Sequence, residues 1–147
     1  MVKDSQNKIS ASLEDYLEAI YEIIEAKQGV KAVEISRKLG VGRSSVTEAL
    51  KALADKKLVN YGRYDVISLT QEGEKAAQSV LLKHNVLREF FADFLGLSDA
   101  EASENACRVE HVISDNALNR FIKFIDYHKA HAKNEDSCLA KFLMQSK

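Results

Sequence analysis

The sequence predicts a mainly α-helical protein, with a winged helix-turn-helix domain over residues 1–72 and an all-helical domain over residues 73–147. Apolar residues recur at helical spacing along most of the 147 residues. The chain has no proline and six glycines, a composition that favours long uninterrupted helices. Strand-like residues interrupt the helices only near residue 60. A hydrophobic content of 46% is typical of a folded globular protein.

The first predicted helix covers residues 12–27. Ser12 is its expected N-cap, with Asp15 three residues further on as the acidic partner. Apolar side chains then follow at helical spacing until Gly29: Leu13, Tyr16, Leu17, Ile20, Tyr21, Ile23 and Ile24.

Two short helices, over 33–39 and 43–56, are expected on either side of the turn Gly40-Val41-Gly42. The second helix separates an apolar face from a polar one. Its apolar face holds Val46, Ala49, Leu50 and Leu53, and its polar face holds Arg43, Ser44, Thr47, Glu48 and Lys51. Such a pair of helices is typical of a helix-turn-helix.

Two strands, over 58–61 and 66–69, are expected to form a hairpin after the second of these helices. This hairpin is the predicted wing. Arg63 lies in its turn, where an arginine can contact a phosphate or the minor groove of DNA.

Four helices are predicted in the second domain. Thr70 is the expected cap of the first of them and Ser98 the start of the second. Their expected ranges are 71–95, 98–114, 115–131 and 135–144. The apolar faces exceed what one small helical lobe can bury, which predicts a homodimer formed mainly by residues after Gln71. These faces include Phe90, Phe91, Phe94, Leu118, Phe121 and Ile125.

Charge is unevenly distributed along the chain. The segment 31–66 carries a local charge of +4, whereas the whole chain carries −1. A basic segment on helices is compatible with a polyanionic partner or with an ordinary solvated face. No stretch approaches the roughly 18 apolar residues of a spanning helix, and the first residues lack the apolar core of a signal peptide, so no membrane contact and a cytoplasmic location are expected.

One helical turn in the second domain combines three potential metal ligands, Cys107, Glu110 and His111. A thiolate, a carboxylate and an imidazole can form half of a transition-metal coordination shell. Asp15 and Glu18 repeat this spacing on the first helix, and buried carboxylates require a partner or a cation.

Each of these residues also has a purely structural interpretation. Cys107 alone can be a small buried hydrophobe, and Asp15 with Glu18 can stabilise a helix N-terminus. His84 is expected to point inward from the long helix and can be a hydrogen-bonded core histidine. His128 and His131 lie in a polar stretch and are expected to be exposed.

These residues resemble the diphtheria-toxin-repressor family of metal-dependent transcriptional repressors, which includes iron-dependent regulators and the manganese transport regulator. The resemblance covers about residues 12–125, and its final string is highly specific. The strings that carry it are Glu14-Asp15-Tyr16-Leu17-Glu18-Ala19-Ile20-Tyr21, Gly42-Arg43-Ser44-Ser45-Val46-Thr47, Leu69-Thr70-Gln71-Glu72-Gly73, Lys83-His84 and Ala106-Cys107-Arg108-Val109-Glu110-His111-Val112-Ile113-Ser114-Asp115.

The resemblance implies a winged-helix head, a helical dimerisation lobe and a set of metal ligands. These ligands are Asp15, Glu18, His84, Cys107, Glu110 and His111. Asp15 and Glu18 resemble the manganese branch, whereas Cys107 resembles the iron branch. Ser103 and Arg88 stand where the iron branch's ancillary site has histidine and glutamate, so that version of a second site is expected to be absent. A third, barrel-like domain is also not expected, because the chain stops at Lys147.

The sequence therefore predicts a metal-dependent homodimeric repressor, and not an enzyme, that binds double-stranded operator DNA of metal-uptake genes. Fe2+ is the preferred activator and Mn2+ the alternative. Arg43 is expected to read guanine, and Lys51 to enter or flank the major groove. Contacts to phosphates or through water are expected from Ser44, Ser45 and Thr47.

Metal is expected to tie the head to the lobe and so set the separation of two recognition helices. Two alternatives remain open. One is a regulator that is metal-independent or responds to an organic effector, and the other is a metal-dependent hydrolase. The hydrolase is disfavoured because nothing in the sequence supplies a separate nucleophile or a phosphate-cradling loop.

Overall fold

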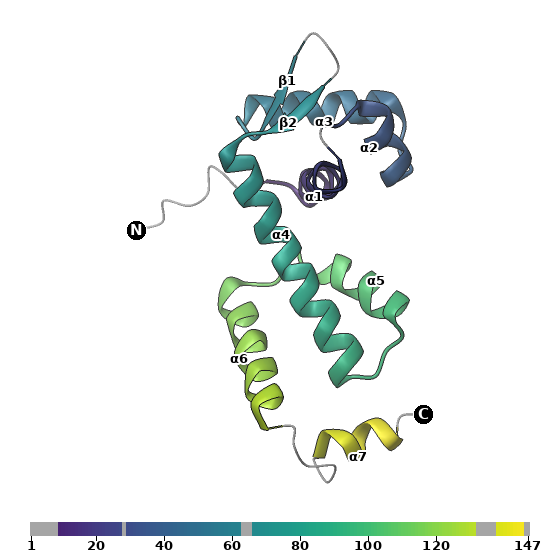
Figure 1. Cartoon of the computed structure of the whole chain (residues 1–147), viewed down its shortest axis with the longest axis vertical. Helices are drawn as coiled ribbons and strands as arrows, with labels where there is room; N and C mark the ends of the chain where they lie inside the picture. Colours follow the sequence, from purple (N-terminus) through teal and green to yellow (C-terminus); the bar gives the residue numbers. More distant parts are fainter. Residues whose placement is uncertain (1–8, 28, 63–65, 132–137, 146–147) are drawn as a thin grey trace. The chain divides into compact units, whose positions relative to one another are not determined.

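The computed structural model describes residues 9–27, 29–62, 66–131 and 138–145. The chain forms two compact units, residues 1–80 and 81–147, each with its own packing (Figure 1). The domain boundary predicted from the sequence, between residues 72 and 73, remains a prediction. Within the described ranges, no helix is long and apolar enough to cross a membrane.

The first unit has the predicted winged helix-turn-helix architecture. Strands β1 and β2 form an antiparallel hairpin in which Val59 lies opposite Leu69, and Val30 bridges to Ile67 as a further rung. The elements, in chain order, are α1 (Ala11–Ala26), α2 (Ala32–Leu39), α3 (Arg43–Asp55), β1 (Val59–Tyr61), β2 (Ile67–Leu69) and the start of α4 (Gln71–Glu89).

The core of this unit is apolar and is drawn from every one of these elements. Helices α1, α2 and α3 each turn one face toward it, as their apolar periodicity predicts. Its completely buried side chains are Leu17, Ile20, Val30, Ile35, Val46, Leu50, Leu53, Ile67 and Ala77.

The N-cap of α1 differs from the prediction. Ser10, and not Ser12, caps the helix, because its Oγ accepts a hydrogen bond from the backbone N–H of Leu13 at 3.3 Å. Ile9 precedes this cap and packs against the core. This tertiary contact fixes where the chain enters the helix and leaves Ser12 exposed within the first turn.

The turn between α2 and α3 requires a glycine at position 40. Gly40 has a φ of +65° and ends α2, and its position in the left-handed region disfavours other residues. The Ser36 hydroxyl donates to the carbonyl of Val41 at 2.6 Å, which secures the chain before α3 begins.

Thr70 caps α4, as predicted. Its hydroxyl accepts from the backbone N–H of Gly73 at 3.0 Å and donates to the carbonyl of Lys57 at 2.7 Å. The first turn of α4 lies so close to Leu58, the residue before β1, that a Cβ atom at Gly73 would stand 1.8 Å from the carbonyl oxygen of Leu58. Only glycine fits there without a backbone shift.

The second unit is entirely helical among its described residues. Its elements are the rest of α4, a π-helical turn η1 (Phe90–Phe94), α5 (Asp99–Val109), α6 (Asp115–His131) and α7 (Cys138–Gln145). The predicted helix over 71–95 thus ends in a π-helical turn, and the predicted helix over 98–114 ends at Val109. Ser98 and Glu101 form a reciprocal capping box at the start of α5, as its sequence position indicated. Residues 135–137 of the last predicted helix lie outside the described residues.

Aromatic side chains dominate the packing of this unit. Phe90 stacks on Phe94 with ring centroids 5.6 Å apart and meets Phe121 edge-on at 4.7 Å. Phe124 remains 43% exposed. His128 is half-buried against Phe124, with centroids 4.5 Å apart, so its predicted exposure is wrong, whereas His131 is exposed as predicted.

Candidate metal centre and nucleic-acid interface

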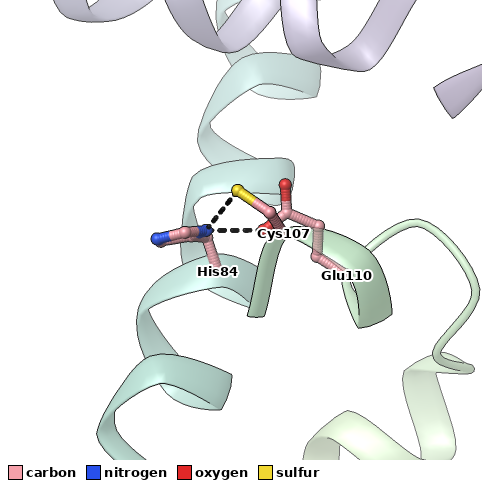
Figure 2. Close-up of side chains that lie close together, drawn as sticks. All are labelled: His84, Cys107 and Glu110. Atoms are coloured by element: carbon pink, nitrogen blue, oxygen red, sulfur yellow. Dashed lines mark hydrogen bonds and ion pairs between the residues drawn. The ribbon is translucent and has the colours of Figure 1, made fainter. Parts of the chain in front are cut away.

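Three side chains with metal-ligating atoms converge in the second unit (Figure 2). His84 comes from α4, Cys107 from α5 and Glu110 from the C-cap of α5. The Nδ1 atom of His84 lies 2.7 Å from Oε2 of Glu110 and 3.7 Å from Sγ of Cys107. One ligand atom from each residue lies within 4.8 Å of the other two.

The local backbone explains why Cys107 and Glu110 point to the same place. Helix α5 ends at Val109, but Glu110 keeps helical dihedral angles and its N–H bonds to the carbonyl of Ala106 at 2.9 Å. The spacing of i and i+3 therefore keeps both side chains on one face.

Glu110 is the buried charged residue of the described chain, with an exposed fraction of 1%. Its Oε2 contacts His84, whereas its Oε1 has no hydrogen-bond partner among the described residues. Nε2 of His111 lies 3.5 Å from Oε1. Leaving a buried acceptor unsatisfied costs about 1–3 kcal/mol, and more for a charged group. This oxygen is therefore suitably placed for a cation.

The donor set fits a divalent transition metal. Imidazole and thiolate ligands suit iron and zinc, whereas carboxylates also suit manganese. Cys107 is exposed and Glu110 is buried, so the cluster combines an exposed residue with a buried one. The residues present are thus compatible with the metal site predicted from the sequence.

Two of the predicted ligands lie elsewhere in the chain. Asp15 and Glu18 belong to α1 in the first unit, where Asp15 is exposed and Glu18 half-buried. Their part in a metal site remains a prediction.

Arg88 and Ser103, the two positions that differ from the iron branch, both contact other side chains. Arg88 forms an ion pair with Asp99 at 3.2 Å. The hydroxyl of Ser103 lies 3.3 Å from Nε2 of His84. Sequence reasoning did not identify this contact, although Ser103 stands four residues before Cys107 and therefore shares its face of the helix.

Helix α3 carries the predicted DNA-contacting side chains. Arg43, Ser44, Ser45 and Lys51 are exposed, while the opposite face of the helix is buried in the core of the first unit. Thr47 is half-buried, and its hydroxyl donates to the carbonyl of Arg43 at 3.0 Å. Arg63 lies outside the described residues.

Two family models match the chain, one over each of its two parts. Residues 8–66 match the model described as the N-terminal DNA binding domain of iron dependent repressors. Residues 70–137 match the model described as their metal binding and dimerisation domain.

Curated relatives cover most of the chain. An uncharacterized HTH-type transcriptional regulator of Methanocaldococcus jannaschii is 40% identical over 82% of this chain and 98% of its own length. The HTH-type transcriptional regulator MntR of Oceanobacillus iheyensis is 31% identical over 80% of each chain.

Solved structures have the same fold. The manganese regulator SloR aligns with a TM-score of 0.70 at 32% identity, over 78% of this chain. A manganese-dependent transcriptional repressor in complex with manganese aligns with a TM-score of 0.72 at 28% identity, also over 78% of this chain. This chain spans about half the length of these two solved proteins, 54% and 53% respectively.

The two matched domains and the relatives of nearly full length confirm the resemblance seen in the sequence. The chain belongs to the diphtheria-toxin-repressor family of metal-dependent transcriptional regulators.

Proposed function

We propose that this chain is a homodimeric repressor that binds double-stranded operator DNA of metal-uptake genes when it is loaded with Fe2+ or Mn2+. The observation that carries the proposal is the buried Oε1 of Glu110, which has no hydrogen-bond partner among the described residues and lies beside two further ligand side chains. A protein that folds around an unsatisfied carboxylate oxygen gains free energy when a cation binds there.

The ligands of the second unit would be His84, Cys107, Glu110 and His111. Asp15 and Glu18 of the first unit would complete the set, as the family resemblance implies. A bound divalent ion would supply positive charge to the buried carboxylate. Ligands from both units would then hold the head and the lobe in one arrangement. If that arrangement fits DNA better, metal and DNA must each tighten the binding of the other.

The DNA-reading surface would be the exposed face of α3. Arg43 stands in its first turn, where a guanidinium can reach the O6 and N7 atoms of guanine. Ser44, Ser45 and Lys51 are exposed beside it and would contact phosphates or flank the groove. Thr47 would contribute mainly through its position, because its hydroxyl already donates to the carbonyl of Arg43. Arg63 of the wing would hold the backbone or the minor groove.

Dimerisation would use the aromatic surface of the second unit. A surface hollow of about 510 Å³ is lined by Phe90, Ala117, Arg120, Phe121 and Phe124. Apolar surface of this kind is typical of an interface between subunits. We expect a dimer in sedimentation experiments at micromolar concentration, with or without metal. A monomer under these conditions would contradict the proposal.

The identity of the activating metal depends on opposing features of the site. The sulfur of Cys107 favours iron over manganese because a thiolate is the softer ligand. The carboxylates favour manganese, and two of the similar solved proteins are named as a manganese regulator and a manganese-dependent repressor. We infer that Fe2+ activates this protein and that Mn2+ can substitute for it.

The exchange of Cys107 for glutamate tests this choice. Cys107→Glu is expected to lower the ratio of Fe2+ to Mn2+ affinity by about tenfold or more, because it replaces the soft ligand by a hard oxygen. The measurement is anaerobic titration of the full-length protein with each ion. An unchanged ratio would show that sulfur does not set selectivity.

The function itself is tested by DNA binding. Protein purified without oxygen is first analysed for metal and then stripped with a chelator. Binding to the DNA upstream of its own gene and of metal-transport genes is measured with Mn2+, with Fe2+ and without metal. We expect tight binding only with metal, and loss of this response in Glu110→Gln. Equal binding with and without metal would favour a regulator that does not depend on metal, and metal-dependent turnover of ester substrates would favour a hydrolase.

A further inference from the structure

The imidazole of His84 is held at both of its ring nitrogens. Nδ1 faces the cluster, at 2.7 Å from Oε2 of Glu110. Nε2 faces the hydroxyl of Ser103, at 3.3 Å. The ring therefore lies between a carboxylate that belongs to the candidate metal centre and a hydroxyl that does not.

Ser103 comes from α5, the helix that also supplies Cys107 and ends at its C-cap Glu110. It lies one turn before Cys107 and two turns before Glu110 in the numbering of α5, so the three share one face. It is half-buried, whereas Asn105 on the same helix is exposed. A shift of α5 along its axis would thus move Ser103, Cys107 and Glu110 together relative to His84.

A neutral imidazole carries one N–H group and one lone pair, and the hydrogen bond at one nitrogen decides the role of the other. If Nδ1 binds a metal, the ring proton must reside on Nε2 and needs an acceptor. If Nδ1–H instead donates to Glu110, Nε2 needs a donor. A hydroxyl group can do both, because it has one proton and two lone pairs. A carboxylate in its place could only accept.

We propose that Ser103 is a positioning residue for His84, which it orients through Nε2 as a metal ligand through Nδ1. In the metal-loaded protein the Ser103 hydroxyl accepts a hydrogen bond from Nε2–H. In the metal-free protein it donates to Nε2 while Nδ1–H bonds to Glu110. Ser103 itself does not contact the ion. This inference rests on the proposed metal-dependent function.

Metal affinity tests the proposal with three variants of the full-length protein. Ser103→Ala removes the hydroxyl, and Ser103→Thr retains it. Asn105→Ala is the matched control, because it also removes one side-chain hydrogen bond of α5, from Asn105 Nδ2 to the carbonyl of Glu101. Loss of such an orienting partner typically weakens metal binding by about 10–100-fold.

We expect the dissociation constant for Mn2+, measured without DNA, to rise by this factor in Ser103→Ala. Ser103→Thr and Asn105→Ala should stay within about threefold of the wild type, since neither removes the orienting hydroxyl. Thermal unfolding in the presence of chelator checks that Ser103→Ala folds as well as Asn105→Ala does. Wild-type affinity in a folded Ser103→Ala protein would overturn the proposal, as would failure of Ser103→Thr to restore affinity.

A spectroscopic measurement on the wild-type protein and Ser103→Ala tests the proposal independently of metal affinity. In the protein loaded with Zn2+ and labelled with 15N at histidine, the proton of His84 should be on Nε2 and should exchange slowly with water. Ser103→Ala should speed up this exchange. Detection of the proton on Nδ1, with Nε2 bound to the metal, would overturn the proposal.

Two further variants separate this inference from the proposed function. If Glu110→Gln and Cys107→Ala both bind Mn2+ as tightly as the wild type, the metal site is wrong and both proposals fail. If these variants lose metal while Ser103→Ala retains it, the inference about Ser103 alone fails.

Discussion

The substitution Glu110→Gln should separate metal binding from folding, because it preserves shape and removes only charge. The side chain of Glu110 is fully buried and its Oε1 has no hydrogen-bond partner in the described residues. Glutamine places a neutral polar group where this charged one was, which lowers the desolvation cost from that of a charged group to the about 1–3 kcal/mol of a neutral one. A glutamine retains a hydrogen bond to His84, but a neutral bond contributes about 1 kcal/mol less than a charge-assisted one. In the absence of metal, the free energy of unfolding should therefore be unchanged or higher by up to about 2 kcal/mol.

Metal should make the wild type more stable than Glu110→Gln. At a Mn2+ concentration 100 times the dissociation constant, the wild type gains about 2.7 kcal/mol of stability by mass action. If the substitution weakens binding 100-fold, the variant gains only about 0.4 kcal/mol at the same concentration. Glu110→Gln, which is at least as stable as the wild type without metal, is then less stable than the wild type with metal.

Urea unfolding curves with chelator and with Mn2+ measure both effects. Glu104→Gln is the matched control, because Glu104 lies on α5 with its side chain 64% exposed and forms an ion pair with Arg108. Its curves should follow those of the wild type. The reasoning is refuted if Glu110→Gln loses more than about 2 kcal/mol without metal, or if it gains as much from Mn2+ as the wild type does.

Three further predictions concern the DNA-reading helix and two helix starts. Arg43→Ala should weaken specific DNA binding by about 1–3 kcal/mol and leave metal affinity without DNA unchanged; an equal loss on random DNA, measured by anisotropy, would argue against base reading. Gly73→Ala should lower the free energy of unfolding by about 1–3 kcal/mol because a Cβ there overlaps backbone, whereas Gly62→Ala, where no atom lies within 4 Å, should not. The Ser98 hydroxyl and backbone N–H lower the pKa of Glu101, so the capping box should stabilise α5 above the ordinary glutamate pKa and lose this effect as pH falls through the lowered pKa. Ser98→Ala should raise the pKa of Glu101 in an NMR titration, and an unchanged pKa would contradict this cause.

The fold was predictable because its main signals are local. Apolar periodicity located the helices, Gly40 located the helix-turn-helix turn, and Thr70 and Ser98 marked two helix starts. The cap of α1 was mispredicted because Ser10 and Ser12 are both good caps by local rules. The packing of Ile9 on the core decides between them, and no local pattern contains that contact.

The π-helical turn η1 was also not predicted, and it too is accompanied by tertiary packing. In this turn the carbonyl of Phe90 accepts a hydrogen bond from the N–H of Leu95, which is five residues later; in an α-helix the donor would be four residues later. The stacking of Phe90 on Phe94 and the packing of both in the second core accompany this change. An apolar pattern predicts that these residues are helical and inward-facing, but it does not specify the hydrogen-bond register.

The candidate site was predictable in part. The spacing of Cys107 and Glu110 placed them together, and the inward position of His84 made contact possible. The contact itself depends on the register between α4 and α5, which is a tertiary property. For the same reason Ser103 was noted only as a departure from a family pattern, whereas the structure gives it a partner in His84.

The proposed ligands differ in burial. Glu110 is fully buried, so a substitution that changes its shape would alter the free energy of folding as well as the affinity for metal. Cys107 is exposed, so its sulfur can be exchanged for a carboxylate with little change in packing. If the proposed site is correct, metal selectivity would be set at Cys107, while Glu110 would couple metal binding to folding. One substitution at the exposed position would then change the preferred metal and keep the same fold.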